Sequence, residues 1–232
     1  MNHLIKIKSL YFKTIYLIYK IFRYKFQTKK NNLEETIDFA FQFFSDPIPF
    51  WQIRDEIKDL LRKIKEKKIK AALEIGTAGG GSLFLFSQVL PHKSVMISID
   101  LPYGKYGGGY PTSRIPIYKS LAKSKQKIHL IRSDSHLEST YNKVKTIINN
   151  KSLDFIFIDG DHSYEGVKKD FETYSQLVKK DGIIAFHDIV PGPVENVGGV
   201  PQFWNEIKKK YRFDEFVKDW EQGGYGIGII YK

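Results

Sequence analysis

AALEIGTAGGGS, at residues 71–82, is the stretch of this sequence that decides the fold. Its apolar first half is typical of a buried strand, and the glycines after it allow the chain to turn sharply into a helix. Such a turn lets backbone N–H groups approach a ligand, toward which the helix presents its positive end. Ala78 stands where the dinucleotide motif G-x-G-x-x-G has its second glycine, and Glu74 is a poor neighbour for a pyrophosphate. The stretch therefore predicts a site for a cationic or amino-bearing ligand.

Apolar runs recur after this stretch, separated by intervals that are long enough for helices. They lie at residues 95–99, 128–131, 155–158 and 183–186. Repeated strand, helix and strand units favour a mainly parallel sheet. The last part of the chain is interpreted as two strands, at residues 213–220 and 225–231, joined by a tight turn. The prediction is an α/β fold with a Rossmann-like, seven-stranded, mainly parallel sheet, a C-terminal antiparallel hairpin and helices on both faces.

Length and charge divide the chain into three parts. The 232 residues suffice for one α/β domain with a full core. Of the 37 basic residues, eight lie in residues 1–32, which contain no acid, so the rest of the chain is nearly balanced and nucleic acid is not an expected partner. No cysteine is present, which excludes a disulfide framework and a thiolate zinc site. We predict a basic extension (1–32), a helical cap (33–69) with helices at 33–44 and 52–68, and a catalytic domain (70–232).

The extension has the periodicity of an amphipathic helix. Its longest uncharged stretch, residues 14–19, is far shorter than the roughly 20 apolar residues that a membrane span needs. Two interpretations stay open: the helix packs on the domain or on a second subunit of a homo-oligomer, or residues 1–27 lie on an anionic membrane surface. The expected location is the cytoplasm, in the second case at the inner face of the membrane. The apolar face consists of Leu4, Ile7, Tyr11, Ile15, Ile18 and Phe22.

Polar side chains follow five of the predicted strands at the point where each strand ends. In open α/β sheets, ligands bind beyond these carboxyl ends. Asp100 could there accept both hydroxyls of a ribose, or it could cap a loop. Asp134 or Ser135 could bond an adenine amino group, or either could start a helix. The strand-end positions are Glu74, Asp100, residues 133–136, residues 159–162, His187 and Asp188.

Two motifs near the fourth and fifth strands carry a resemblance to a known family. IDGDHSYEGV at residues 158–167, followed by Asp170, and IAFHDI at residues 184–189 resemble class I methyltransferases that use S-adenosylmethionine. The group includes the sugar O-methyltransferases of macrolide biosynthesis and the cephalosporin hydroxylase-like proteins. SIDLP at residues 98–102 and GGGYP at residues 107–111 look like the same group. The resemblance covers roughly residues 70–232 and leaves the extension unexplained.

The resemblance implies a cofactor site along the strand ends. Glu74, Gly76, Ala78 and Ser82 would surround the methionine end of S-adenosylmethionine. Asp100 would hold the ribose, and Asp134 with Ser135 the adenine. The full predicted set is Glu74, Gly76, Thr77, Ala78, Gly80, Ser82, Asp100, Leu101, Asp134, Ser135 and Asp159.

The resemblance also implies catalytic and metal-binding residues. Asp159 and the pair His187 and Asp188 would hold a metal. Because Mg²⁺ prefers oxygen ligands, two alternatives stay open: Asp159 and Asp188 alone hold a weak Mg²⁺, or the site with His187 holds a nitrogen-tolerant ion such as Mn²⁺. His162 matches the position of a general base, and a neutral imidazole can take a hydroxyl proton near pH 7. His162 could instead be a structural histidine at a helix start. Asp159 is the second predicted catalytic residue.

These residues favour one function over two alternatives. The favoured function is transfer of a methyl group from S-adenosylmethionine to a hydroxyl of a sugar or glycosylated small molecule. The alternatives are a metal-dependent hydrolase and a non-catalytic scaffold that binds a nucleotide or a membrane. Loops at 103–111 and 191–201 are predicted as a lid and a wall around the acceptor, and Phe203 and Trp204 are favoured as core residues. The hydrolase would use Asp159, Asp161, His162, His187 and Asp188.

Overall fold

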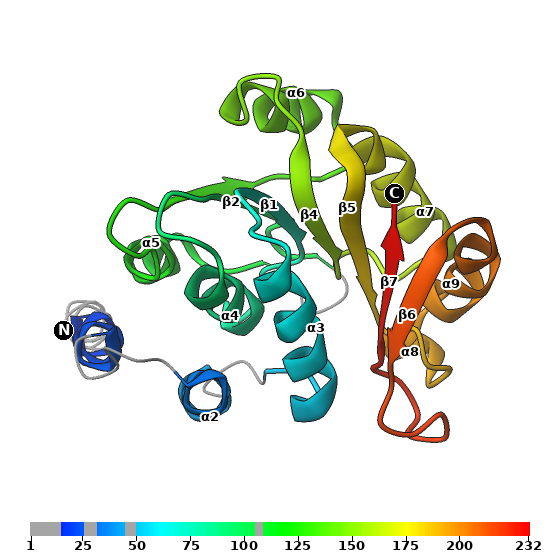
Figure 1. The fold of residues 1–232 in the computed structure, drawn as a ribbon, viewed down its shortest axis with the longest axis horizontal. Helices are drawn as coiled ribbons and strands as arrows, with labels where there is room; N and C mark the ends of the chain where they lie inside the picture. The colour runs from blue at the N-terminus through cyan, green and yellow to red at the C-terminus, as the bar shows by residue number, and fades with distance from the viewer. Residues whose placement is uncertain (1–14, 26–31, 45–49, 105–108) are drawn as a thin grey trace, which may run out of the picture.

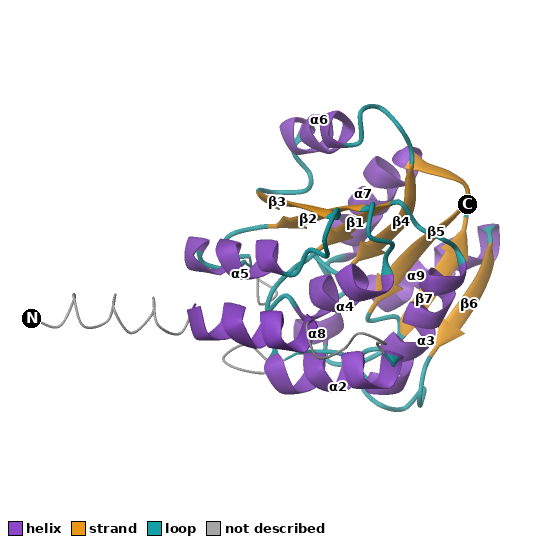
Figure 2. Ribbon diagram, turned by 60° about the vertical axis from the view of Figure 1, so that its left-hand side comes forward, coloured by secondary structure: helices purple, strands orange, loops and turns teal. Residues whose placement is uncertain are grey.

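The computed structural model describes residues 15–25, 32–44, 50–104 and 109–232. In this part of the chain a seven-stranded sheet runs through the molecule, with helices on both sides (Figure 1 and Figure 2). The strands are β1 (Ala71–Ile75), β2 (Val95–Asp100), β3 (Lys127–Arg132), β4 (Leu153–Ile158), β5 (Val178–His187), β6 (Arg212–Phe216) and β7 (Ile227–Tyr231). The helices are α2 (Leu33–Phe43), α3 (Arg54–Glu66), α4 (Gly81–Val89), α5 (Ile115–Ser120), α6 (Glu138–Ile147), α7 (Tyr164–Tyr174), α8 (Val194–Val197) and α9 (Val200–Ile207), with short 3-10 turns η1 (Thr112–Arg114), η2 (Ser175–Leu177) and η3 (Lys208–Lys210).

The strand order is β3-β2-β1-β4-β5-β7-β6. Neighbouring strands from β3 to β5 pair in parallel, and β7 pairs antiparallel with both β5 and β6. The central strands are buried on both faces, which is why their sequences are continuous apolar runs. The predicted Rossmann-like, mainly parallel sheet with helices on both faces is confirmed.

The C-terminal hairpin is present, but its connection was predicted wrongly. The connection between β6 and β7 comprises residues 217–226 and is not a tight turn. Glu56 of α3 accepts hydrogen bonds from Lys218 N (3.0 Å), Gln222 Nε2 (2.8 Å) and Gly226 N (2.9 Å). This buried carboxylate holds the loop against α3, so the first strand of the hairpin ends earlier than the sequence pattern indicates.

Each face of the sheet has its own core. One core joins the sheet to α2, α3, α4 and α5, and the other joins it to α6, α7 and α9. Phe203 and Trp204 are buried in the second core, as the sequence favoured. Parallel strands between two helical layers leave their carboxyl ends as the open edge, where α3 and α8 lie.

Residues 15–25 form a helical segment that packs beside α2 and α5. Ile21 of this segment is 1% exposed. Lys25 Nζ donates to the carbonyl oxygens of Ser120 (2.5 Å) and Ala122 (2.6 Å) at the end of α5. The described part of the extension is therefore attached to the domain.

Only part of the predicted apolar face of the extension packs against the domain. Ile18 packs against the core, whereas Ile15 and Phe22 are 46% and 66% exposed. Leu4, Ile7 and Tyr11 lie outside the described residues. Within the described ranges, no helix combines the length and the apolar content that crossing a membrane would require.

Candidate active site

The glycine-rich turn after β1 is fixed against the end of β4. Gly76 has a φ of +95°, and a Cβ at this position would lie 1.8 Å from the carbonyl oxygen of Asp159. The Asp159 N–H donates to Ile75 O (2.8 Å). Only glycine fits so close an approach, so the turn and the residue after β4 form one rigid unit.

Glu74 lies fully buried behind this turn. Its carboxylate accepts hydrogen bonds from Ser82 Oγ (2.5 Å) and Ser98 Oγ (2.9 Å), and Ser98 Oγ is also bonded to Thr77 Oγ1. Burial raises the pKa of Glu74 to about 8, although the two serine hydrogen bonds act in the opposite direction. Glu74 therefore connects the start of α4 to β2 from inside the protein.

Asp100 supports the same turn from the end of β2. One carboxylate oxygen accepts from Thr77 N (3.1 Å) and Ala78 N (2.7 Å), and the other accepts from Gly109 N (3.0 Å). Burial raises the pKa of Asp100, while the backbone N–H donors oppose this. The side chain is 5% exposed and fixes the shape of the turn.

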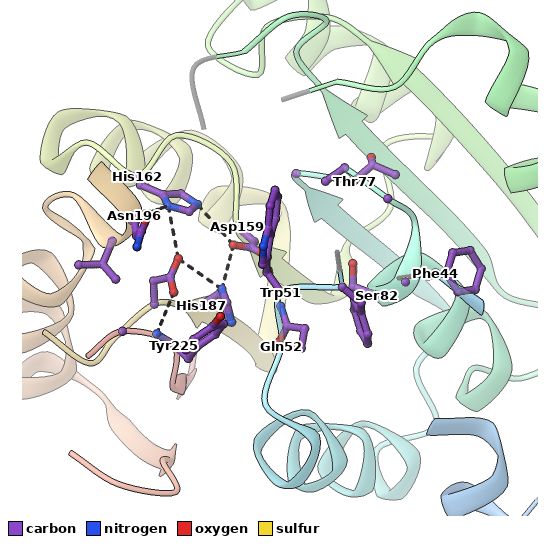
Figure 3. A pocket seen from close by; sticks show the side chains of 18 of the residues that line it. Phe44, Trp51, Gln52, Thr77, Ser82, Asp159, His162, His187, Asn196 and Tyr225 are labelled. Carbon is purple, nitrogen blue, oxygen red and sulfur yellow. Dashed lines mark hydrogen bonds and ion pairs between the residues drawn. The ribbon is translucent and has the colours of Figure 1, made fainter. Parts of the chain in front are cut away.

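Two histidines and two aspartates meet beyond β4 and β5 (Figure 3). Asp159 Oδ1 lies 3.1 Å from His187 Nδ1 and 3.5 Å from His162 Nε2. Asp188 Oδ2 lies 3.3 Å from His162 Nδ1 and 3.4 Å from His187 Nδ1. Asp188 Oδ1 accepts from Tyr225 N (3.0 Å), so the loop before β7 holds the cluster in place.

Hydrogen-bond chemistry assigns the proton on His162. Nδ1 lies 2.5 Å from the carbonyl oxygen of Asn196, which can only accept, so Nδ1 carries a hydrogen. The lone pair of the neutral ring is then on Nε2, the nitrogen near Asp159. His162 can therefore take a proton on Nε2 without losing its bond to Asn196.

The cluster also shifts the pKa values of its members. Burial alone would lower the pKa of His162 and of His187, but the carboxylates of Asp159 and Asp188 outweigh it and raise both, that of His187 strongly. Burial opposes ionisation of Asp159, yet the charges of the two histidines lower its pKa to about 2. The carboxylates therefore favour the protonated form of both histidines, and the histidines favour the ionised form of Asp159.

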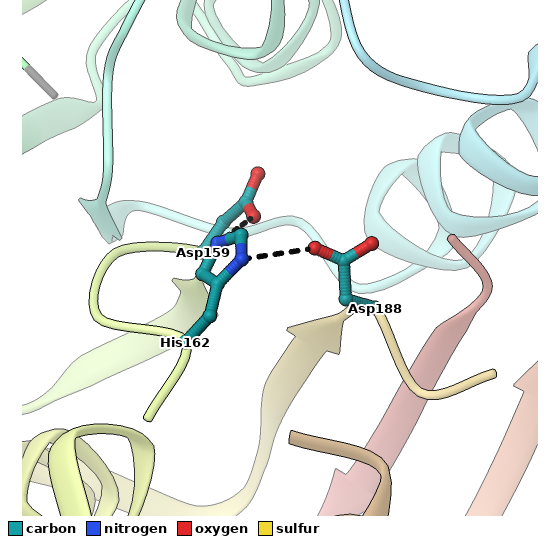
Figure 4. Close-up of side chains that lie close together, drawn as sticks. All are labelled: Asp159, His162 and Asp188. Atoms are coloured by element: carbon teal, nitrogen blue, oxygen red, sulfur yellow. Dashed lines mark ion pairs between the residues drawn. The ribbon is translucent and has the colours of Figure 1, made fainter. Parts of the chain in front are cut away.

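Three of these side chains could hold a cation (Figure 4). Asp159, His162 and Asp188 each offer one ligand atom, and the three atoms lie within 4.8 Å of one another. Two carboxylate oxygens and an imidazole nitrogen suit Mn²⁺ better than Mg²⁺, which prefers oxygen. His187, a predicted ligand, contacts the same carboxylates but does not complete this group. The donor set fits a nitrogen-tolerant cation held through His162.

A cavity of about 310 Å³ joins the turn to the cluster. Residues 76–82 line one side of it, and Asp159, His162, His187 and Asp188 line the other. In Figure 3, Trp51 and Gln52 stand between Thr77 and Ser82 of the turn and the imidazole–carboxylate cluster. An aromatic wall is contributed by Phe44, Phe50, Trp51 and Tyr225. The volume lies within the range of small-molecule sites.

Gln52 is a lining residue that sequence reasoning missed. It is 8% exposed, and its Oε1 has no hydrogen-bond partner in the described structure. Its Nε2 lies 3.4 Å from Asp159 Oδ2, to which it donates. Leaving a buried acceptor unpaired is unfavourable, so Oε1 is placed to receive a donor from a ligand. The sequence showed Gln52 only as the first residue of a charged helix.

The predicted cofactor residues fall into two groups. Glu74 and Asp100 lie behind the turn, and Leu101 does not line the cavity. Six others line it: Gly76, Thr77, Ala78, Gly80, Ser82 and Asp159.

Asp134 and Ser135 also lie away from the cavity. Asp134 Oδ1 accepts from His136 N (2.8 Å), and Ser135 O accepts from Tyr174 Oη (2.7 Å). The first contact is a turn-forming bond, and neither Asp134 nor Ser135 starts a helix, because α6 begins after Leu137.

Other predicted site elements have mixed positions. Asp161 accepts from Ser163 N (2.9 Å) and, like His187, is outside the cation-binding group, so that group lacks two of the five residues of the hydrolase arrangement. Residues 195–197 line the cavity within the predicted wall at 191–201. Of the predicted lid at 103–111, residues 105–108 lie outside the described residues.

Comparison with known proteins identifies the family of the chain. A family model described as a methyltransferase domain matches residues 73–189, about half of the chain. The chain therefore belongs to this family of methyltransferase domains, and the class I methyltransferase resemblance is confirmed.

Individual relatives are more distant. The chain is 33% identical over 130 residues to the uncharacterized protein R132 of Acanthamoeba polyphaga mimivirus, covering 53% of each protein. It is 28% identical over 166 residues to caffeoyl-CoA O-methyltransferase of Populus kitakamiensis, covering 66% of each. Its fold is similar to that of an O-methyltransferase from Bacillus cereus in complex with SAH, with a TM-score of 0.57, 17% identity and coverage of 90% and 96%. The chain thus spans about half to two thirds of the length of these two curated relatives.

Proposed function

We propose that the protein transfers the methyl group of S-adenosylmethionine to a hydroxyl oxygen of a small molecule, with His162 as the general base. One observation carries this proposal: a single cavity contains both the glycine-rich turn after β1 and the imidazole of His162. The Bacillus cereus structure contains SAH, the product that such a transfer leaves, and this supports the choice of cofactor.

The turn would hold the methionine end of the cofactor. Its backbone leads into α4 at Gly81. The positive end of that helix would stabilise the carboxylate of the cofactor's methionine end. Gln52 Oε1 would accept a hydrogen bond from the ammonium group. When bound, S-adenosylmethionine supplies an electrophilic methyl carbon, which passes to the acceptor oxygen as the carbon–sulfur bond breaks.

His162 would remove the hydroxyl proton. Nε2 accepts the proton while Nδ1 keeps its hydrogen bond to Asn196 O. Asp159, 3.5 Å away, stabilises the imidazolium that forms, and Asp188 holds the ring from the other side. Fixing both reactants in one cavity supplies much of the remaining acceleration.

A divalent cation would use the same nitrogen. Asp159, Asp188 and His162 fit Mn²⁺, which would orient the hydroxyl and lower its pKa. The lone pair on Nε2 cannot bind a metal and accept a proton together. Metal binding by His162 and base catalysis by His162 therefore exclude each other. We propose that His162 acts as the base.

A sugar hydroxyl is the proposed acceptor. Trp51, which is 47% exposed, and Tyr225 offer flat apolar surfaces at the cavity, and Glu195 and Asn196 add polar groups. Aromatic faces with polar groups beside them suit a sugar ring. We also propose that residues 33–69 form a cap above the catalytic domain 70–232 and select this acceptor, since Phe44, Phe50, Trp51 and Gln52 contribute to the cavity wall.

Calorimetric titration with S-adenosylmethionine and with SAH tests the cofactor. Both should bind to the folded protein, and failure of both would disprove the proposal. Transfer of labelled methyl groups to a panel of free sugars and glycosides, with and without a chelator, then tests the chemistry. Activity that survives the chelator agrees with His162 as base, whereas activity that requires added Mn²⁺ assigns His162 to the metal.

A further inference from the structure

The helical segment 15–25 has a second apolar side, which faces away from the domain. Its inner side is fixed, because Tyr24 Oη donates to Thr36 Oγ1 (2.7 Å) and Lys25 Nζ binds the end of α5. On the outer side four large side chains are exposed by about half or more. They are Ile15 (46%), Tyr16 (55%), Tyr19 (53%) and Phe22 (66%).

These four residues lie on one side of the helix. Their spacing of one, three and three residues places them along a single stripe. Lys20 Nζ lies 5.0 Å from the centre of the Tyr16 ring, and Arg23 is exposed next to Phe22. The stripe, which we call the outer stripe (Ile15, Tyr16, Tyr19 and Phe22), is therefore aromatic in its middle and basic at its edge.

The surroundings of the outer stripe are also basic. Residues 1–32 contain no acid, and none occurs between Asp100 and Asp134, a stretch that includes α5. Lys119 and Lys125 are exposed on either side of the contact made by Lys25.

The acids of α2, which packs beside the segment, are largely paired. Glu34 and Asp38 form salt bridges with Arg54, at 2.7 Å each, and Glu34 also pairs with Lys58 (2.7 Å). Glu35 is exposed, but its single negative charge leaves the net charge of the region positive. Positive charge therefore borders the outer stripe with little compensation.

We infer that the outer stripe binds an anionic lipid surface. Tyrosine and phenylalanine rings enter the interface between headgroups and acyl chains, while Lys20, Arg23 and the lysines near α5 contact the anionic headgroups. A second copy of the chain fits less well, because a two-fold contact through this face would bring two positive surfaces together. Membrane binding through a helix fixed to the domain would give the enzyme one orientation on the surface.

Vesicle flotation of the full chain tests this inference. The probes are phosphatidylcholine vesicles and vesicles of phosphatidylcholine with an equal amount of phosphatidylglycerol. We expect binding to the mixed vesicles only, decreasing with salt. The combined variant Lys20→Gln and Arg23→Gln should bind about 25-fold more weakly, because each charge near the surface contributes about fivefold. The combined variant Tyr16→Ser, Tyr19→Ser and Phe22→Ser should lose binding by about tenfold or more.

Leu137→Ser is the matched control, since Leu137 is 49% exposed at α6, away from the segment. It should bind like the wild type. Equal binding to both kinds of vesicle, or normal binding by the triple serine variant of the outer stripe, would overturn the inference. So would a dimer, seen by light scattering, that only the serine variant loses, because the outer stripe would then be a subunit interface. None of these readouts depends on methyl transfer.

Discussion

The acids at the ends of β1 and β2 and those after β4 and β5 lie at the same edge of one sheet, yet they have different partners. Glu74 and Asp100 accept hydrogen bonds from serines and backbone N–H groups and do not line the cavity. Asp159 and Asp188 face two histidines and the cavity. A strand-end position makes an acid available for chemistry, and the donors that surround it decide whether it shapes the site or acts in it.

Changing Glu74 should have the largest effect, and the effect should be on stability. The native state keeps a proton on Glu74 up to about pH 8, whereas the unfolded chain releases it near its ordinary value of 4.5. Stability should therefore fall as the pH rises through this window, by up to about 1.4 kcal/mol per pH unit. Glu74→Gln should flatten the fall, measured as the thermal midpoint from pH 5 to 8. A variant with the same pH slope as the wild type would show that Glu74 is ionised in the native protein.

Changing His162 should affect turnover instead. His162→Ala removes the proposed base and should lower kcat by about 100-fold or more, with SAH affinity unchanged. The control is His92→Ala, because His92 is exposed and outside the cavity. Normal turnover in His162→Ala would place the base elsewhere. The acids after β4 and β5 would then have no demonstrated role in the reaction.

Changing Asp100 should sharpen the comparison, because it separates support of the turn from ribose binding. Asp100→Ala removes the acceptor of three backbone N–H groups and should weaken cofactor binding about tenfold or more. The thermal midpoint of the ligand-free protein should fall as well, less so in Asp100→Asn. Weaker binding without any loss of stability would instead assign Asp100 to direct contact with the cofactor.

Gln52 lies between the two groups of acids and should show the smallest effect. Gln52→Leu keeps the approximate size of the side chain but removes the unpaired Oε1, and it should weaken S-adenosylmethionine binding about fivefold in calorimetry. Gln42→Leu, on the exposed side of α2, serves as the control. Equal affinity in the two variants would rule out a ligand role for Oε1.

Most of the sheet could be predicted from the sequence, because strands buried on both faces require apolar runs. β1 covers the apolar first half of the stretch 71–82, as expected, and β2, β3 and β4 are longer than the predicted runs by one or two residues at their ends. The hairpin connection could not be predicted, since Glu56 acts on it from α3, far away in the sequence. Its Gly–Gly pair resembled a tight turn, whereas the loop extends over residues 217–226 and is bonded to the Glu56 carboxylate.

The candidate site could be predicted in position but less well in detail. Parallel strands bring their carboxyl ends together, so the proximity of the turn, Asp159, His162 and Asp188 follows from the pattern. The burial of Glu74 could not be inferred, because Ser98 comes from a neighbouring strand. Gln52 precedes β1 in the chain and reaches the site only through the packing of α3.

The bond between Glu56 and the loop before β7 also has a consequence for the order in which the protein is made. Gly226 N and the Glu56 carboxylate are separated by 170 positions in the chain, and the same loop carries Tyr225 to the cavity. During synthesis the glycine-rich turn emerges from the ribosome long before this loop does. The cavity wall can close only after Tyr225 and Gly226 have been released, so a chain that ends before these residues would have an incomplete site.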